Sequence, residues 1–181
     1  MEKRVQWCED IKKRGVAFLV HCFTDETSVW LDKHSRKVWV HKEDPFAHVI
    51  ARPKNLVRVM LWAGISFQGP TDTCIIPSGV KLNALKYQEI LNDYFVPFNA
   101  KVYGGNCVLV QDNAPVHKAK TTMAKLEEWN VKVEAWPAES PDLNPVELVW
   151  AHLNDRLRNE YRPANLAELK DSITAYWKKF F

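Results

Sequence analysis

Three acidic residues stand where a folded chain could bring them together around divalent metal ions. Asp25 follows an apolar, β-rich segment at 16–23, and Asp112 follows another at 107–110. Glu147 lies one turn into a predicted helix. Sites in open α/β sheets gather at the ends of neighbouring strands. Carboxylate oxygens suit Mg²⁺ or Mn²⁺, and two such ions about 4 Å apart can drive a phosphoryl displacement. We therefore take these acids as candidate ligands of a phosphoryl-transfer site.

Each of the three acids also has an ordinary structural explanation. Asp25 and Asp112 belong to a residue type that is common in the turns after strands. Asn144 is a suitable N-cap and Pro145 a suitable first helical residue, which would place Glu147 where a capping box needs its glutamate. Residue types alone leave the structural and the catalytic interpretations open.

The helix that carries Glu147 favours the catalytic interpretation. It has an apolar stripe at helical spacing, and Glu147 lies beside that stripe, so this carboxylate borders the core where a site at the end of a sheet would be. Glu26, next to Asp25, is expected on the opposite face of its strand. The stripe consists of Val146, Val149, Trp150, Leu153 and Leu157.

The order of predicted elements gives the fold class. Antiparallel strands come first, then alternating helices and strands, then two helices, which predicts a mixed α/β domain with helices flanking one sheet. Pro97 is expected to end the helix before it. In chain order we expect a helix at 4–13, strands at 16–23, 28–31, 37–41, 56–67 and 72–76, a helix at 83–95, a strand at 107–110, a helix at 118–129, a strand at 131–135, and helices at 144–158 and 166–177.

Basic residues are concentrated in one segment. The chain has 181 residues, 46% of them hydrophobic, which is enough for one domain with its own core. Its net charge is only +3, but the segment from Lys33 to Arg58 holds seven Lys or Arg against two acids, interleaved with Trp39 and Phe46. Such a segment suits a nucleic-acid backbone, although a solvated surface hairpin explains it as well.

Cysteine usage and hydropathy exclude several protein classes. The four cysteines show no C-x-x-C pair and no regular spacing, which argues against a disulfide framework and a zinc knuckle. No apolar run approaches the roughly 20 residues that a membrane helix needs. We therefore expect a soluble, intracellular protein without a membrane partner.

Four segments resemble the catalytic domain of Tc1/mariner transposases. Residues 23–26 (FTDE) are similar to the family's first catalytic strand end, and residues 111–117 (QDNAPVH) to its second-aspartate motif. Residues 140–147 (SPDLNPVE) resemble the segment with the third carboxylate, and residues 62–64 (WAG) resemble the family's strand before the second hairpin. The 34 residues between the second and third acid match the Tc1 branch, as does glutamate as the third acid.

This resemblance implies a fold, a chemistry and a set of ligands. The fold is α/β and ribonuclease H-like, with a mixed five-stranded sheet flanked by helices. The chemistry is metal-dependent cleavage of DNA followed by transfer of the freed 3′ end. Asp25, Asp112 and Glu147 would be the catalytic residues and would hold two Mg²⁺ or Mn²⁺ ions.

The resemblance also implies partners and supporting residues. The partner is double-stranded DNA, as transposon ends and TA target sites; family members form homodimers and work in the nucleus. Asn113, His117 and Asn144 are expected to support the site or contact DNA, with packing at a helix start as an equal alternative for His117. The predicted contacts with the DNA backbone are Lys37, Lys42, Arg52 and Lys54.

The domain organisation departs from the family pattern. Residues 1–20 resemble the end of a connecting helix, and residues 21–181 the catalytic domain. The helix-turn-helix modules that read transposon ends are expected to be missing. Two alternatives stay open: a truncated or host-adopted remnant that only binds DNA, and another ribonuclease H-like nuclease such as an integrase.

Overall fold

The fold is built on one mixed β-sheet. The computed structural model describes residues 2–31 and 58–181. The strands lie in the order β3-β2-β1-β5-β6, and β4 also pairs with β2. β2, β3 and β4 form the antiparallel half, whereas β5 and β6 continue the sheet from β1 in parallel. The strands are β1 (His21–Trp30), β2 (Arg58–Ser66), β3 (Gly69–Pro70), β4 (Cys74–Ile76), β5 (Val108–Val110) and β6 (Lys132–Val133).

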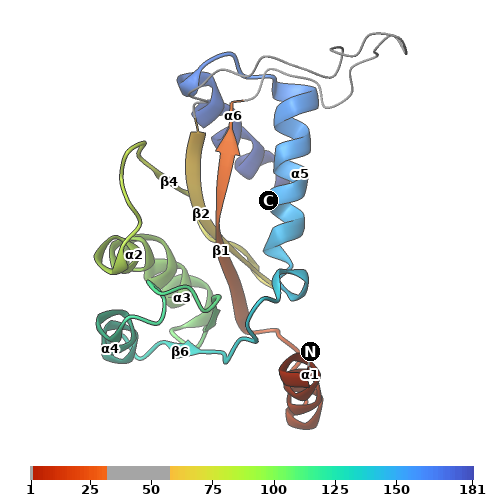
Figure 1. The fold of residues 1–181 in the computed structure, drawn as a ribbon, viewed down its shortest axis with the longest axis vertical. Coiled ribbons are helices and arrows are strands. Elements are labelled where there is room, and N and C mark those ends of the chain that lie inside the picture. The colour runs from red at the N-terminus through yellow and green to blue at the C-terminus, as the bar shows by residue number, and fades with distance from the viewer. Residues whose placement is uncertain (1, 32–57) are drawn as a thin grey trace, which may run out of the picture.

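Helices cover both faces of this sheet (Figure 1). One core lies between the sheet and α2, α3 and α4, with Trp62, Tyr87 and Phe95 fully buried in it. The other core lies between the sheet and α5 and α6, with Trp150 and Ile173 at its centre. The helices are α1 (Glu2–Arg14), α2 (Ala84–Ile90), the π-helix η1 (Leu91–Phe95), α3 (Val96–Tyr103), α4 (Lys120–Glu128), the 3₁₀ turn η2 (Pro141–Leu143), α5 (Val146–Arg156), the π-helix η3 (Leu157–Tyr161) and α6 (Leu166–Phe180).

The predicted fold class is confirmed. The sheet is mixed and flanked by helices, although it contains six strands in the described ranges rather than five. All the predicted helices occur, as does the pairing of 72–76 with the long strand before it, here as β4 on β2. The predicted strand at 37–41 lies outside the described residues. Within residues 2–31 and 58–181, no helix is long and apolar enough to cross a bilayer.

Pro97 does not end a helix, contrary to the prediction. It lies in the first turn of α3, which continues from α2 through the π-helix η1. In that wider turn the Val96 N–H bonds to the Leu91 carbonyl, five residues back. A proline is tolerated in the first turn of a helix because its missing N–H has little to bond there, and the π-turn creates such a start within the chain.

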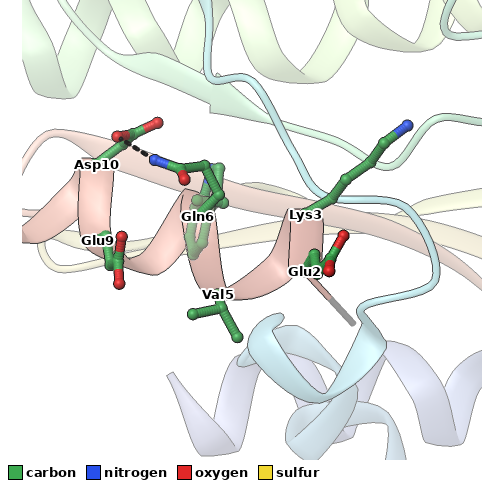
Figure 2. Close-up of a pocket in the computed structure, with 7 residues that line it drawn as sticks. Glu2, Lys3, Val5, Gln6, Glu9 and Asp10 are labelled. Carbon is green, nitrogen blue, oxygen red and sulfur yellow. Dashed lines mark hydrogen bonds between the residues drawn. The ribbon is translucent and has the colours of Figure 1, made fainter.

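Helix α1 lies at the end of the sheet and is fastened to the segment before α5. Trp7 donates its indole N–H to the Ala135 carbonyl at 2.5 Å, and the Arg14 guanidinium pairs with the buried Glu134 at 2.6 Å. A shallow pocket open to solvent is lined by residues of α1 alone, Trp7 among them. Figure 2 shows it, with Gln6 donating to Asp10 at 3.1 Å.

Gly64 on β2 has no room for a side chain. The Cβ of an alanine there would lie 2.6 Å from the Cys22 sulfur and 2.8 Å from the Thr24 methyl group, both on β1. We expect Gly64→Ala to lower the free energy of unfolding by about 1–3 kcal/mol, because overpacking forces side chains off their rotamers. Urea unfolding measures the change. Unaltered stability would mean that β1 moves aside at no cost.

Candidate active site

Asp25 lies in the middle of a strand, not at its end. β1 runs unbroken from His21 to Trp30 because β2 pairs with it along this length, with Asp25 opposite Ala63. The prediction of two strands separated at 24–27 was therefore wrong, and so was the turn explanation of Asp25. Thr24 and Thr27 in this segment are β-branched and suit a strand.

The parallel partner of β1 does end beside Asp25. β5 pairs with β1 as far as Val110 opposite Phe23, where its pairing stops. Continuing this register by two residues places the backbone of Asp112 level with that of Asp25. The two acids thus share the carboxyl end of the parallel pair, which is where α/β sheets form their sites.

The Asp25 side chain points towards α5. Its Oδ2 accepts a hydrogen bond from the Trp150 indole at 3.2 Å. Burial, together with the nearby charges of Glu26 and Glu147, raises the pKa of Asp25 to about 7, although a backbone hydrogen bond at Glu26 and the Trp150 N–H act in the opposite direction. Asp25 is therefore a half-buried carboxyl group beside two other acids, an environment that favours a cation.

Glu147 is exposed in the first turn of α5. The predicted capping box is absent. Asn144 accepts from the Val146 N–H at 3.3 Å, but its own N–H donates to the Pro141 carbonyl at 2.9 Å, so no donor is left there for Glu147. Within the described part of the chain the Glu147 carboxylate accepts no hydrogen bond, and it lies near enough to Asp25 to raise the pKa of that acid.

Asp112 is held by His117 rather than by the other two acids. Its Oδ1 lies 2.6 Å from the Nδ1 of His117, whose Nε2 lies 3.2 Å from the Glu26 carboxylate. The hydrogen bond from His117 lowers the pKa of Asp112. Burial lowers the pKa of His117, but its bonds to Asp112 and Glu26 outweigh burial and raise it to about 9. Glu26 lies on the face of β1 opposite Asp25, as predicted from strand alternation.

Only two of the three acids therefore lie close together. Asp25 and Glu147 approach one another on the α5 side of β1, whereas Asp112 turns towards His117 on the other side. Among residues 2–31 and 58–181, no three His, Cys, Asp or Glu side chains form a ready chelating group. The Asp112 side chain is 57% exposed, however, so it has room to rotate.

The predicted supporting residues Asn144 and Asn113 fasten different segments of the chain. Asn144 is buried and donates to the Thr24 carbonyl at 3.3 Å, which fastens the start of α5 to β1 beside Asp25. Asn113 donates to the Trp136 carbonyl at 2.9 Å, so it braces the segment that leads to α5.

Sequence reasoning missed the contact between Trp150 and Asp25. Trp150 was assigned only to the apolar stripe of its helix. Its spacing was informative, since a residue three positions after Glu147 lies on the same side of α5. The predicted DNA-backbone residues Lys37, Lys42, Arg52 and Lys54 lie outside the described residues, and their assignment stays a prediction.

Sequence comparison connects most of the chain with transposases. The DDE superfamily endonuclease profile matches residues 20–170. The chain is 26% identical over 163 residues to the transposable element Tcb2 transposase of Caenorhabditis briggsae, covering 87% of this chain and 59% of that protein. It is 29% identical over 126 residues to the Tc3 transposase of Caenorhabditis elegans, covering 66% of this chain and 36% of that protein. The chain thus spans less than two thirds of the length of these relatives.

Structural comparison gives the same fold. The Mos1 mariner paired-end complex with Mn superposes with a TM-score of 0.81 at 24% identity, over 98% of this chain and 54% of that one. The catalytic domain of Mos1 mariner transposase superposes with a TM-score of 0.74 at 22% identity, over 98% of this chain and 80% of that one. The ribonuclease H-like architecture is therefore shared. Because the profile covers all three acids and most of the sheet around them, the chain belongs to the DDE superfamily endonucleases.

Proposed function

We propose that this chain is the catalytic domain of a Tc1-like transposase, which cuts DNA and joins the freed 3′ end to a target. The observation that carries this proposal is the position of Asp25, half-buried, level with Asp112 and beside Glu147. A buried carboxylate next to like charges is costly unless a cation compensates it. Membership of the endonuclease family supports the same assignment.

The residues present fit divalent metal ions. Three carboxylates supply the oxygen ligands that Mg²⁺ and Mn²⁺ prefer, and the raised pKa of Asp25 indicates an acid that lacks its counter-charge. Mn is also named for the Mos1 paired-end complex. Two bound ions would supply an activated nucleophile and a stabilised leaving oxygen. Asp25, Asp112 and Glu147 would hold them.

In this proposal, Asp112 exchanges partners when the metal binds. Its carboxylate would leave the Nδ1 of His117 and rotate towards Asp25, which its exposure allows. His117 would keep its hydrogen bond to Glu26 and so remain in place next to the site. Before a metal binds, the contact with His117 would thus keep the Asp112 carboxylate away from the negative charges of Asp25 and Glu147.

The proposed substrate is double-stranded DNA, as transposon ends and TA target sites, with the protein acting in the nucleus as a homodimer. Relatives named as transposases support a DNA substrate. The basic residues Lys37, Lys42, Arg52 and Lys54 are proposed to bind phosphates. Because each phosphate contact releases counterions, the affinity for DNA should fall steeply with salt, and reversing these four charges should flatten that dependence.

A plasmid-nicking assay tests the proposed function. We expect the purified chain to nick supercoiled plasmid with Mg²⁺ or Mn²⁺ and to stop when EDTA removes the metal. The Asp112→Asn variant, folded by circular dichroism, controls for a contaminating nuclease and should not nick. A folded chain that binds DNA without nicking it, under conditions that support the intact relatives, would instead favour a remnant that only binds DNA.

A further inference from the structure

The indole of Trp150 makes one polar contact in the described structure, and that contact is with the proposed metal ligand Asp25. Trp150 is 2% exposed in the core between the sheet and α5. Its N–H donates to Asp25 Oδ2 at 3.2 Å, which leaves Oδ1 without a bond to any described side chain. A buried tryptophan in this protein need not have a hydrogen-bond acceptor. The N–H of Trp62, on the opposite face of the sheet, has no partner among the described residues.

Packing against α6 fixes the orientation of the Trp150 ring. Its ring stacks on Trp177 of α6, with 5.9 Å between the ring centroids and 30° between the planes. Trp177 in turn donates its indole N–H to the Thr71 carbonyl at 2.8 Å. The Thr71 hydroxyl accepts from the Gly64 N–H at 2.8 Å, one residue along β2 from the partner of Asp25. The two indoles thus connect Asp25 on β1 to α6.

We propose that Trp150 is a positioning residue that holds one oxygen of Asp25 so that the other faces the metal. The inference rests on the proposed function. Ligating carboxylates are themselves usually hydrogen-bonded, and losing such a partner costs about 10–100-fold in metal affinity or activity. Because α5 carries both Trp150 and Glu147, the helix that supplies the third carboxylate also orients the first one.

The hydrogen bond itself can be tested without metal or DNA. In the intact chain the Trp150 indole N–H resonance, assigned by sequential NMR correlations, should shift upfield when Asp25→Ala removes its acceptor. The Trp177 indole resonance, bonded to Thr71, should keep its hydrogen-bonded position. A Trp150 resonance that does not move would overturn the proposed contact.

Metal affinity tests the consequence. Calorimetric titration with Mn²⁺ should show about 10–100-fold weaker binding for Trp150→Phe, which keeps the aromatic packing but loses the donor. The matched control Trp62→Phe should bind as the parent does. Parent-like affinity in Trp150→Phe would reject the positioning role and leave the proposed function standing. Parent-like affinity in Asp25→Asn would contradict the proposed function itself, and the positioning role with it.

Discussion

Replacing Glu147 by glutamine is expected to reduce metal-dependent DNA nicking by more than about 100-fold while leaving the fold at least as stable. Loss of a residue that only supports a ligand already costs about 10–100-fold, and Glu147 is proposed as a ligand itself. Its carboxylate is exposed and its charge opposes ionisation of Asp25, so glutamine removes a repulsion without creating a cavity. Plasmid nicking and urea unfolding measure the two effects.

Glu160 offers the matched control near the far end of the same helical segment. Its carboxylate pairs with Arg156 at 2.7 Å and with Lys179 at 3.0 Å, away from the acids. Glu160→Gln should leave nicking unchanged, since these exposed ion pairs contribute little. If Glu147→Gln nicks at the parent rate, Glu147 is not a ligand. If it unfolds instead, the glutamate is needed for the start of α5, which the structure argues against.

The acids could be predicted from the sequence because their motifs are local. Residues 111–117 and 140–147 each carry their own turn or helix start, so their resemblance to transposase motifs is enough to propose Asp112 and Glu147. The strand around Asp25 could not be predicted in the same way. Its polar run resembles a turn locally, and only pairing with β2, more than thirty residues later in the chain, keeps it extended.

The hydrogen-bond partners of the side chains could not be predicted from the sequence either. A helical period predicts that Trp150 is buried, but not that its N–H meets Asp25, because that contact depends on how α5 lies across β1. The capping box failed for a similar reason, since Asn144 and Pro141 form a tight turn that uses the N–H which Glu147 would need. The two partners of His117 likewise follow from the sheet, because Glu26 lies on β1 and Asp112 follows the neighbouring strand β5.

The acidic charge is divided between the two faces of β1. Asp25 and Glu26 are adjacent and point to opposite sides, so each face carries one of them. On the α5 side Asp25 meets Glu147 and its pKa rises. On the other side the single positive charge of His117 is shared between Glu26 and Asp112. Because the two acids on the second face favour the protonated form of His117, the stability of the chain gains a specific dependence on pH.

The free energy of unfolding of the metal-free chain is expected to fall by about 2 kcal/mol between pH 6.5 and 8.5. The pKa of His117 is about 9 in the folded chain and about 6.5 when unfolded, so the folded state holds a proton that the unfolded state releases. This contribution, about 3 kcal/mol in full, is complete below pH 6.5 and is lost as the pH rises through 9. Urea unfolding in EDTA at the two pH values measures it.

The variant His117→Gln should abolish most of that fall, because glutamine cannot carry the proton that bridges Asp112 and Glu26. His152→Gln is the control, since His152 bonds to the Tyr176 hydroxyl and not to a carboxylate, and it should keep the full dependence. Asp25 also destabilises the chain as the pH rises, but mainly between its ordinary range near 4 and about 7, largely below the window used here. Equal slopes in the parent and in His117→Gln would show that His117 is not protonated between the two acids.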